Sequence, residues 1–248
     1  MPSGGGSEIE PEGTLANVIG VVLAAGESRR FGRAKLGEHL AGQSVLARSV
    51  GLMVRHDRVD QCLLVVRSKH DPAVRSLLRD APQPACITGG ESRAHSCLAA
   101  LEHLQNSGAA AEDIVLIHDA ARALASPELV SACIDALREA RAAVPVLPLA
   151  DTVVMLDAPD GRLAPGPSRS LLHTSQTPQA FRLGVILEAY RRAGADLDNT
   201  DEATLLMRTM PDEAIAAVAG EVTNCKLTQP EDLAVMCALI EQLENKDP

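Results

Sequence analysis

The feature that most constrains this chain is an alternation of short apolar runs with helix-like segments. The runs "NVIGVVLA" (17–24), "QCLLVVR" (61–67) and "DIVLIHD" (113–119) have the length of strands and are almost continuously apolar. Strands that are apolar on both faces lie inside parallel sheets, where crossover helices cover both sides. The sequence therefore predicts an α/β fold with a mostly parallel central sheet.

Segments with helix signals lie between these strands in the sequence. Ser126 suits an N-cap, because its hydroxyl can accept a bond from the first turn, and Pro127 suits the first helical position. Near the end of the chain, Thr228 and Glu231 have the spacing of a capping box. Helices are expected at 44–53, 71–78, 93–104 and 183–193, and two further strands at 84–90 and 142–149.

Composition is typical of a globular protein. With 46% apolar but only 1% aromatic residues, Ala, Leu and Val must fill the core of the 248-residue chain. No apolar run approaches the roughly 20 residues that cross a membrane. The start, "MPSGGGSEIEPEGTL" (1–15), lacks the basic-then-apolar order of a signal peptide. We expect a disordered leader at 1–15, a single domain at 16–248 and a cytoplasmic location.

Charge and cysteine usage exclude several classes of function. The net charge of −10 argues against a nucleic-acid partner, because phosphate backbones need a basic face, although a few arginines can still attract a small anion. The six cysteines form no C-x-x-C pair, and the seven histidines have no zinc-like spacing. Small buried thiols in a reducing compartment are expected.

The regular alternation breaks after Leu149. The stretch at about 150–172 is rich in Pro and Gly, and Asp160-Gly161 suits a hairpin turn. An extended arm of this kind has little to pack on within one α/β layer. We therefore expect it to lie on a second subunit.

Polar segments follow the apolar strands at the ends where open α/β sheets bind ligands. In the first of them, Ala24, Ala25 and Gly26 allow close approach of the backbone to a ligand, while Arg29, Arg30 and Lys35 offer donors to phosphate. The segment is neither a dinucleotide fingerprint nor a P-loop, and a solvated basic loop is the alternative. The four segments are "AAGESRR" (24–30), "GGESRAHS" (89–96), "HDAAR" (118–122) and "TNCKLTQPED" (223–232).

Asp119 is the acid that ends the strand at 113–119. A carboxylate at this place suits a Mg²⁺ ion carried by phosphates, and a structural pair with Arg122 is the alternative. His118 is expected to pack or hydrogen-bond rather than act as a base. Arg93 and Ser96 follow a Gly-Gly turn, where they can contact a base or ribose or simply start a helix.

Together these motifs resemble the 2-C-methyl-D-erythritol 4-phosphate cytidylyltransferases of the non-mevalonate isoprenoid pathway. The resemblance runs from about Asn17 to Leu243. It implies a Rossmann-like nucleotidyltransferase fold, transfer of a cytidylyl group from CTP with Mg²⁺, release of pyrophosphate, and a homodimer joined by the arm. It is carried, in order, by "HDAAR" (118–122), "DT" (151–152), "R-x-x-L…QTPQ" (169–179), "TDEA" (200–203) and "K-x-T-x-P-E-D" (226–232).

The resemblance also implies roles for individual residues. The catalytic cations are Arg30, Lys35 and Lys226, of which Lys226 serves the reacting α-phosphate. Asp119 serves the metal. The substrate phosphate is held by Arg169 and Thr200, supplied by the partner subunit, with Arg122 and Thr177 lining the same pocket. CTP is held by Ala24, Ala25, Gly26, Gly90, Ser96, Asp119 and Ala120.

Two other functions remain open from the sequence. The chain could transfer the cytidylyl group to another polyol phosphate, such as ribitol 5-phosphate, because only the acceptor pocket would differ. It could also be a nucleotide-binding module without turnover, since the loop from Gly26 to Lys35 is shorter than the usual family form and Ala34 replaces a proline. Two further departures are Ser28 in place of a common glycine and His173 in place of a frequent tryptophan.

Overall fold

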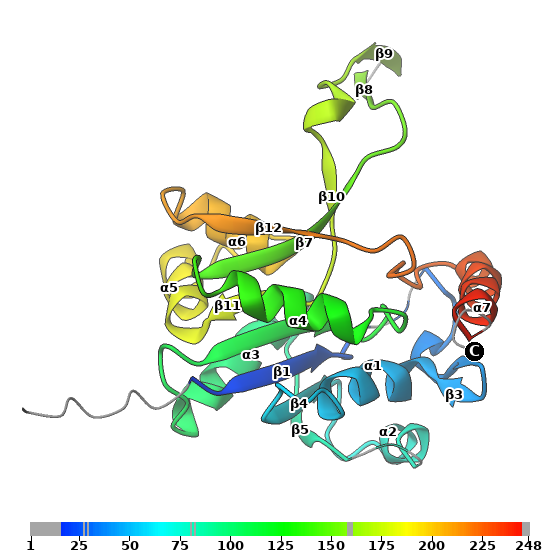
Figure 1. The fold of residues 1–248 in the computed structure, drawn as a ribbon, viewed down its shortest axis with the longest axis vertical. Coiled ribbons are helices and arrows are strands. Elements are labelled where there is room, and N and C mark those ends of the chain that lie inside the picture. The colour runs from blue at the N-terminus through cyan, green and yellow to red at the C-terminus, as the bar shows by residue number, and fades with distance from the viewer. Residues whose placement is uncertain are drawn as a thin grey trace, which may run out of the picture.

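The computed structural model describes residues 16–26, 28, 30–79, 81, 83–157 and 161–244. Two layers of helices enclose an eight-stranded sheet, and a slender arm projects from this body (Figure 1). The predicted leader at 1–15, Arg29 and Asp160 lie outside the described residues.

Four parallel strands form the part of the sheet that the apolar runs predicted. They lie in the order β6 (Ile114–Asp119), β1 (Val18–Leu23), β4 (Gln61–Val66) and β5 (Ala85–Thr88). In register, the last residue of β1, Leu23, faces both Val65 and Asp119. Their carboxyl ends therefore meet at one edge, and the four loops that follow these strands share it.

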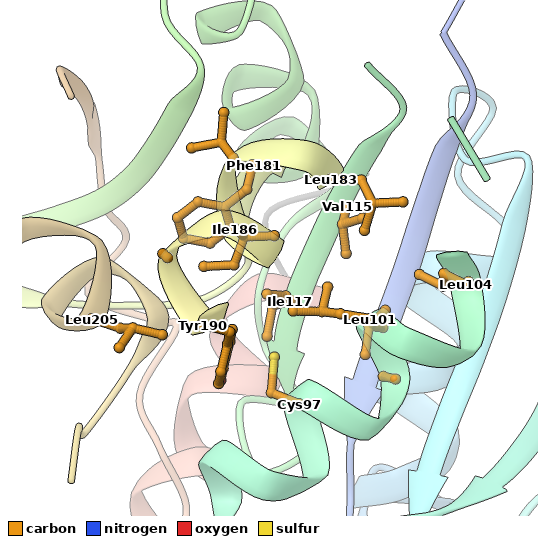
Figure 2. Packing of buried hydrophobic residues seen from close by; sticks show 14 of the residues in the cluster. Cys97, Leu101, Leu104, Val115, Ile117, Phe181, Leu183, Ile186, Tyr190 and Leu205 are labelled. Carbon is orange, nitrogen blue, oxygen red and sulfur yellow. The ribbon is translucent and has the colours of Figure 1, made fainter. Parts of the chain in front are cut away.

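Alternate side chains of the sheet pack against the two helical layers. Ile19 and Val21 of β1 join a cluster with helices α3 (Arg93–Asn106) and α5 (Leu183–Ala193). Figure 2 shows this cluster, in which Tyr190 of α5 lies against Cys97 of α3. Val18 and Val22 point the other way, toward helices α1 (Val45–Val54) and α4 (Pro127–Ala136). Small aliphatic residues fill most of this core, as the composition required.

The other half of the sheet contains antiparallel strands that the sequence did not reveal. β11 (Gln179–Arg182) runs antiparallel between β6 and β7 (Ala142–Pro148), and β10 (His173–Ser175) runs antiparallel to β7. β12 (Ile215–Ala219) pairs with β7 in parallel. β10 and β11 are only three and four residues long and carry polar ends, so they lack the long apolar run that indicates a buried strand.

Helix caps follow the sequence except at the last helix. Ser126 accepts from Leu129 N with Pro127 at the first position, as predicted. The predicted capping box of Thr228 and Glu231 is wrong, because helix α7 (Pro230–Glu244) begins one residue later than that cap requires and the hydroxyl of Thr228 donates to Lys226 O. Asp232 instead accepts from the backbone N–H groups of Thr228 and Gln229, at 2.7 and 2.8 Å. Thr228 therefore stays in the loop before α7.

The arm carries a separate two-stranded hairpin of β8 (Val154–Asp157) and β9 (Arg162–Pro165). It stands clear of the body in Figure 1, and its apolar side chains are exposed, including Leu156 at 69% and Leu163 at 71%. The remaining elements are η1 (Lys35–Gly37), β2 (His39–Leu40), β3 (Gln43–Ser44), α2 (Pro72–Leu77), η2 (Arg169–Leu171) and α6 (Glu202–Thr209).

Within the described ranges, no helix has the length and apolar character to cross a membrane. All six cysteines are free thiols, and Cys97 and Cys133 are fully buried. Cys97 and Cys133 therefore match the expectation of small buried thiols, whereas Cys62, Cys86, Cys225 and Cys237 are only partly buried.

Candidate active site

A cavity of about 750 Å³ opens at the carboxyl edge of the parallel strands. Residues from the loops after β1, β4, β5 and β6, and from the segment before α7, line it. The sequence predicted that segments 24–30, 89–96, 118–122 and 223–232 would meet, and each contributes to this cavity, together with Arg67 after β4. Nine predicted site residues line the cavity, namely Ala24, Ala25, Gly26, Arg30, Lys35, Gly90, Ser96, Asp119 and Lys226.

The loop after β1 forms one wall of this cavity. Ala24 N donates to Val65 O at 2.8 Å, which fixes where the loop leaves the sheet. Ser28 adopts a positive φ of 52°. At the far end of the loop, Lys35 Nζ donates to Leu227 O at 2.8 Å and so ties it to the segment before α7. Burial, together with the charge of Lys226, lowers the pKa of Lys35.

The turn after β5 forms the opposite wall. Ser96 Oγ accepts from Gly90 N at 3.1 Å, so its hydroxyl holds the turn. A Cβ atom at Gly90 would lie 2.5 Å from the Cβ of His95, and one at Gly89 would lie 2.6 Å from Ser96 Oγ. The backbone therefore passes the start of α3 too closely for any side chain, and this leaves the turn's own backbone to face the cavity.

Asp119 lies between two cations at the floor of the cavity. Its Oδ1 accepts from Arg93 Nε at 3.0 Å, and its Oδ2 accepts from Lys226 Nζ at 2.6 Å. Burial would raise the pKa of Asp119, but the charges of Arg93 and Lys226 outweigh it and hold that pKa well below its usual range. The carboxylate is thus ionised throughout the neutral range.

The alternative pairing of Asp119 with Arg122 is not observed. Arg122 instead donates to two backbone carbonyls, Asn224 O at 2.7 Å and Ser175 O at 3.2 Å. The arginine that pairs with Asp119 is Arg93, for which the sequence predicts contact with the base or ribose, or only a helix start.

His118 is a structural histidine, as expected. It is fully buried, and its Nε2 lies 3.2 Å from Arg122 O while its Nδ1 lies 3.1 Å from Thr177 Oγ1. A carbonyl only accepts, so Nε2 carries the proton and Nδ1 accepts from the threonine hydroxyl. Burial lowers the pKa of His118 to about 4, which keeps it neutral.

Five predicted site residues lie outside the cavity lining. Ala120 and Thr177 are buried, and the hydroxyl of Thr177 accepts from Asp119 N at 3.0 Å. Arg169 lies on the arm, where its Nη1 donates to Ala150 O at 2.8 Å, and Thr200 is exposed just before α6. Their roles toward substrate, like that of Arg122, stay predictions.

Sequence reasoning missed Glu202 and Tyr190. Glu202 is completely buried and accepts from Arg93 and from the hydroxyl of Tyr190. The available signal was an acid at the start of α6 among the apolar residues Ala203, Leu205 and Leu206. Buried carboxylates are rare unless paired, so an acid in such surroundings indicates a hidden cation.

The donors present suit a Mg²⁺ ion that arrives with phosphates. Among the described residues, no group of three or more His, Cys, Asp or Glu side chains could hold a metal by itself. Mg²⁺ commonly takes one or two carboxylates and completes its shell with substrate phosphates and water. Asp119 offers one ionised carboxylate beside a basic cavity, which fits that mode of binding.

Comparisons with known proteins agree with the site and the fold. Residues 18–242 match the family model described as 2-C-methyl-D-erythritol 4-phosphate cytidylyltransferase. A protein of that name from Thermobifida fusca is 38% identical over 242 residues, which cover 93% of this chain and 96% of the relative.

A bifunctional ribulose 5-phosphate reductase/CDP-ribitol pyrophosphorylase from Haemophilus influenzae is 30% identical over 229 residues, covering 90% of this chain but 48% of that protein. The crystal structure of 4-diphosphocytidyl-2C-methyl-D-erythritol synthase from Anaerococcus prevotii superposes with a TM-score of 0.78 at 27% identity, covering 91% of this chain and 96% of the other. The chain belongs to the 2-C-methyl-D-erythritol 4-phosphate cytidylyltransferase family.

Proposed function

We propose that the cavity at the carboxyl edge is where this chain transfers a cytidylyl group from CTP to 2-C-methyl-D-erythritol 4-phosphate, giving 4-diphosphocytidyl-2-C-methyl-D-erythritol and pyrophosphate. One observation carries the assignment of the site. Arg30, Lys35, Asp119 and Lys226, which lie up to 196 positions apart in the sequence numbering, line a single cavity. Had they lain on separate faces, the assignment would have failed.

The chemistry needs charge neutralisation more than proton transfer. The phosphate oxygen of the acceptor is already anionic at neutral pH, so no general base is required, and the neutral, buried His118 is consistent with this. Attack on the α-phosphorus brings two anionic groups together. Arg30, Lys35 and Lys226 lower this repulsion and stabilise the charge that develops on the phosphoryl oxygens.

Asp119 would hold Mg²⁺ together with the triphosphate. The ion, when bound, supplies a further positive charge on the phosphate oxygens. The backbone of Ala24, Ala25 and Gly26 would approach the nucleotide, and the Gly90 turn with Ser96 would contact the cytosine; all five residues line the cavity. Lys226 must exchange its bond with Asp119 for one with the α-phosphate.

The acceptor site is proposed to form between two subunits. Arg169 and Thr200 of one chain would hold the phosphate of 2-C-methyl-D-erythritol 4-phosphate near the cavity of the other, with Arg122 and Thr177 beside it. The exposed apolar hairpin of β8 and β9 supports this, because a partner surface would bury it. Arg169 belongs to the same arm and does not line its own chain's cavity.

A pyrophosphate-release assay tests the activity and its specificity. CTP, ATP, GTP and UTP are each paired with 2-C-methyl-D-erythritol 4-phosphate and with ribitol 5-phosphate, in Mg²⁺ buffer. We expect release with CTP and 2-C-methyl-D-erythritol 4-phosphate. Release with ribitol 5-phosphate alone would assign the chain to the other acceptor, and no release with any pair would leave a nucleotide-binding module.

A further inference from the structure

We propose that Glu202 and Tyr190 are positioning residues that lock Arg93 onto one oxygen of Asp119, so that the other oxygen becomes available to the metal when Lys226 turns to the nucleotide. This inference rests on the roles proposed above for Asp119 and Lys226. Neither Glu202 nor Tyr190 lines the cavity. Their effect on the reaction would pass through Arg93.

Arg93 bridges two carboxylates with different nitrogens of one guanidinium. Its Nη1 lies 2.9 Å from both Oε1 and Oε2 of Glu202, while its Nε lies 3.0 Å from Oδ1 of Asp119. Because the guanidinium is planar and its Nη1 is held by both oxygens of Glu202, the direction in which Nε points is restricted. The position of Asp119 Oδ1 is therefore set from Glu202.

The anchor itself is fixed by the core. Glu202 is fully buried, and the hydroxyl of Tyr190 donates to its Oε1 at 3.0 Å. Tyr190 is 3% exposed and packs against Cys97, as Figure 2 shows. The three residues come from three helices: Arg93 from α3, Tyr190 from α5 and Glu202 from α6. The packing of these helices therefore sets the orientation of the Arg93 guanidinium toward Asp119.

The two cations on Asp119 are held very differently. Arg93 is anchored in the core, whereas Lys226 comes from the segment before α7 and its side chain is 36% exposed. A phosphate in the cavity would draw Lys226 away and free Oδ2. Asp119 would then keep one cation, one fixed oxygen and one free oxygen, which is the state a single-carboxylate Mg²⁺ site needs.

This inference can be tested without turnover by measuring the binding of Mn²⁺, a substitute for Mg²⁺. Electron paramagnetic resonance detects the binding, with CTP present and the acceptor absent. Glu202→Gln keeps the size of the side chain but removes its charge. We expect a roughly 10- to 100-fold weaker affinity for Mn²⁺ with CTP, the range seen when the support of a metal ligand is lost. Tyr190→Phe keeps Glu202 charged and should weaken Mn²⁺ binding in the same direction by a smaller factor.

Kinetics and a matched control separate positioning from stability. Glu202→Gln should raise the apparent KM values for Mg²⁺ and CTP while leaving that of the acceptor nearly unchanged. Asp135→Asn removes the partner of Arg58, a pair at 3.0 Å on the surface of α4, and should bind Mn²⁺ as the wild type does. A thermal melt monitors folding, and Tyr190→Phe keeps the test informative if Glu202→Gln folds poorly.

Asp119→Asn distinguishes failure of this inference from failure of the proposed function. If Asp119→Asn weakens Mn²⁺ binding but folded Glu202→Gln and Tyr190→Phe bind Mn²⁺ like the wild type, the positioning role is wrong and the metal role of Asp119 stands. If Asp119→Asn also binds Mn²⁺ normally, the metal role itself is wrong, and the inference falls with it.

Discussion

The cavity and the arm differ in how their side chains are paired and buried. In the cavity, Arg93 and Lys226 both pair with Asp119, and the lining residues come from strand ends, loops and helix starts at one sheet edge and from the segment before α7. On the arm, Leu156 and Leu163 remain about 70% exposed and the hairpin belongs to a sheet of its own. The cavity is lined by charged groups that pair within the chain, whereas the hairpin leaves its apolar face exposed, and each region can be perturbed separately.

The largest effect is expected from Lys226→Ala. Removing this cation should reduce turnover by on the order of 10²–10³ or more, by analogy with the loss of one transition-state donor. The fold should stay intact because Lys226 lies in an open loop, and circular dichroism checks this. Steady-state pyrophosphate release measures the rate, and near-normal turnover would show that the α-phosphate is served by another group.

The second prediction tests whether the hairpin of the arm holds a dimer together. Leu156 and Leu163 face each other across the hairpin, so Leu156→Glu with Leu163→Glu places two charges on one apolar face. Burying each leucine is worth about 1.5–3 kcal/mol, so a dimer held by this face should weaken by about a hundredfold or more.

Sedimentation velocity measures that dimer. Val235→Glu, at a comparably exposed site on α7, is the control and should leave the dimer unchanged. Equal association of all three proteins would remove the arm from the interface.

The third prediction joins the two regions. Arg169→Ala should raise the KM for the acceptor by roughly 10- to 100-fold, the loss of one charge-assisted hydrogen bond, while the KM for CTP changes little. Mixing this variant with Lys226→Ala chains tests the exchange between subunits. If Arg169 acts on the partner's cavity, the mixture should regain activity, and a mixture without regain would mean that Arg169 serves the cavity of its own chain.

The smallest effect is expected in the pH dependence of the reaction, and it concerns Lys35 in the cavity. The pKa of Lys35 is lowered by burial and by Lys226, and the phosphate needs the charged form. The value of kcat/KM for CTP, which reports on the free enzyme, should therefore fall as pH rises through a pKa below the ordinary 10.5.

Lys35→Arg keeps its charge at high pH and should move this alkaline limb upward. An unchanged limb in Lys35→Arg would mean that another group sets it. The arm variants should share the wild-type profile, because the arm contributes no group to this titration.

Most of the central sheet could be predicted from its apolar runs. The strands at 17–24, 61–67 and 113–119 appear within one residue of those bounds, and the segments after the first and last of these meet as expected. β11 could not be predicted, because a four-residue strand bounded by Gln179 and Arg182 has too little apolar pattern. The capping box was predicted wrongly because the spacing of Thr228 and Glu231 does not say which acid bonds the loop before the helix. In the structure that acid is Asp232, which accepts from the backbone N–H of Gln229.

Part of the candidate site could also be predicted from the sequence. Arg30, Lys35 and Asp119 stood out because they end or follow apolar strands, whereas Lys226 was assigned through the family resemblance. Glu202 did not stand out, since its partner Arg93 lies 109 positions away and nothing local marks the pair. The pairing of Asp119 with Arg93 rather than Arg122 also depends on which helix packs beside β6.

What the sequence alone determined is the order of strands, helices and polar loops, because apolar periodicity and helix signals act over a few residues. It thereby also determined that cations and one acid would stand at the same edge of a parallel sheet. Only the tertiary structure decided which cation faces which acid. A salt bridge forms between side chains brought together by helix packing, and that packing is set by the whole core rather than by any short segment.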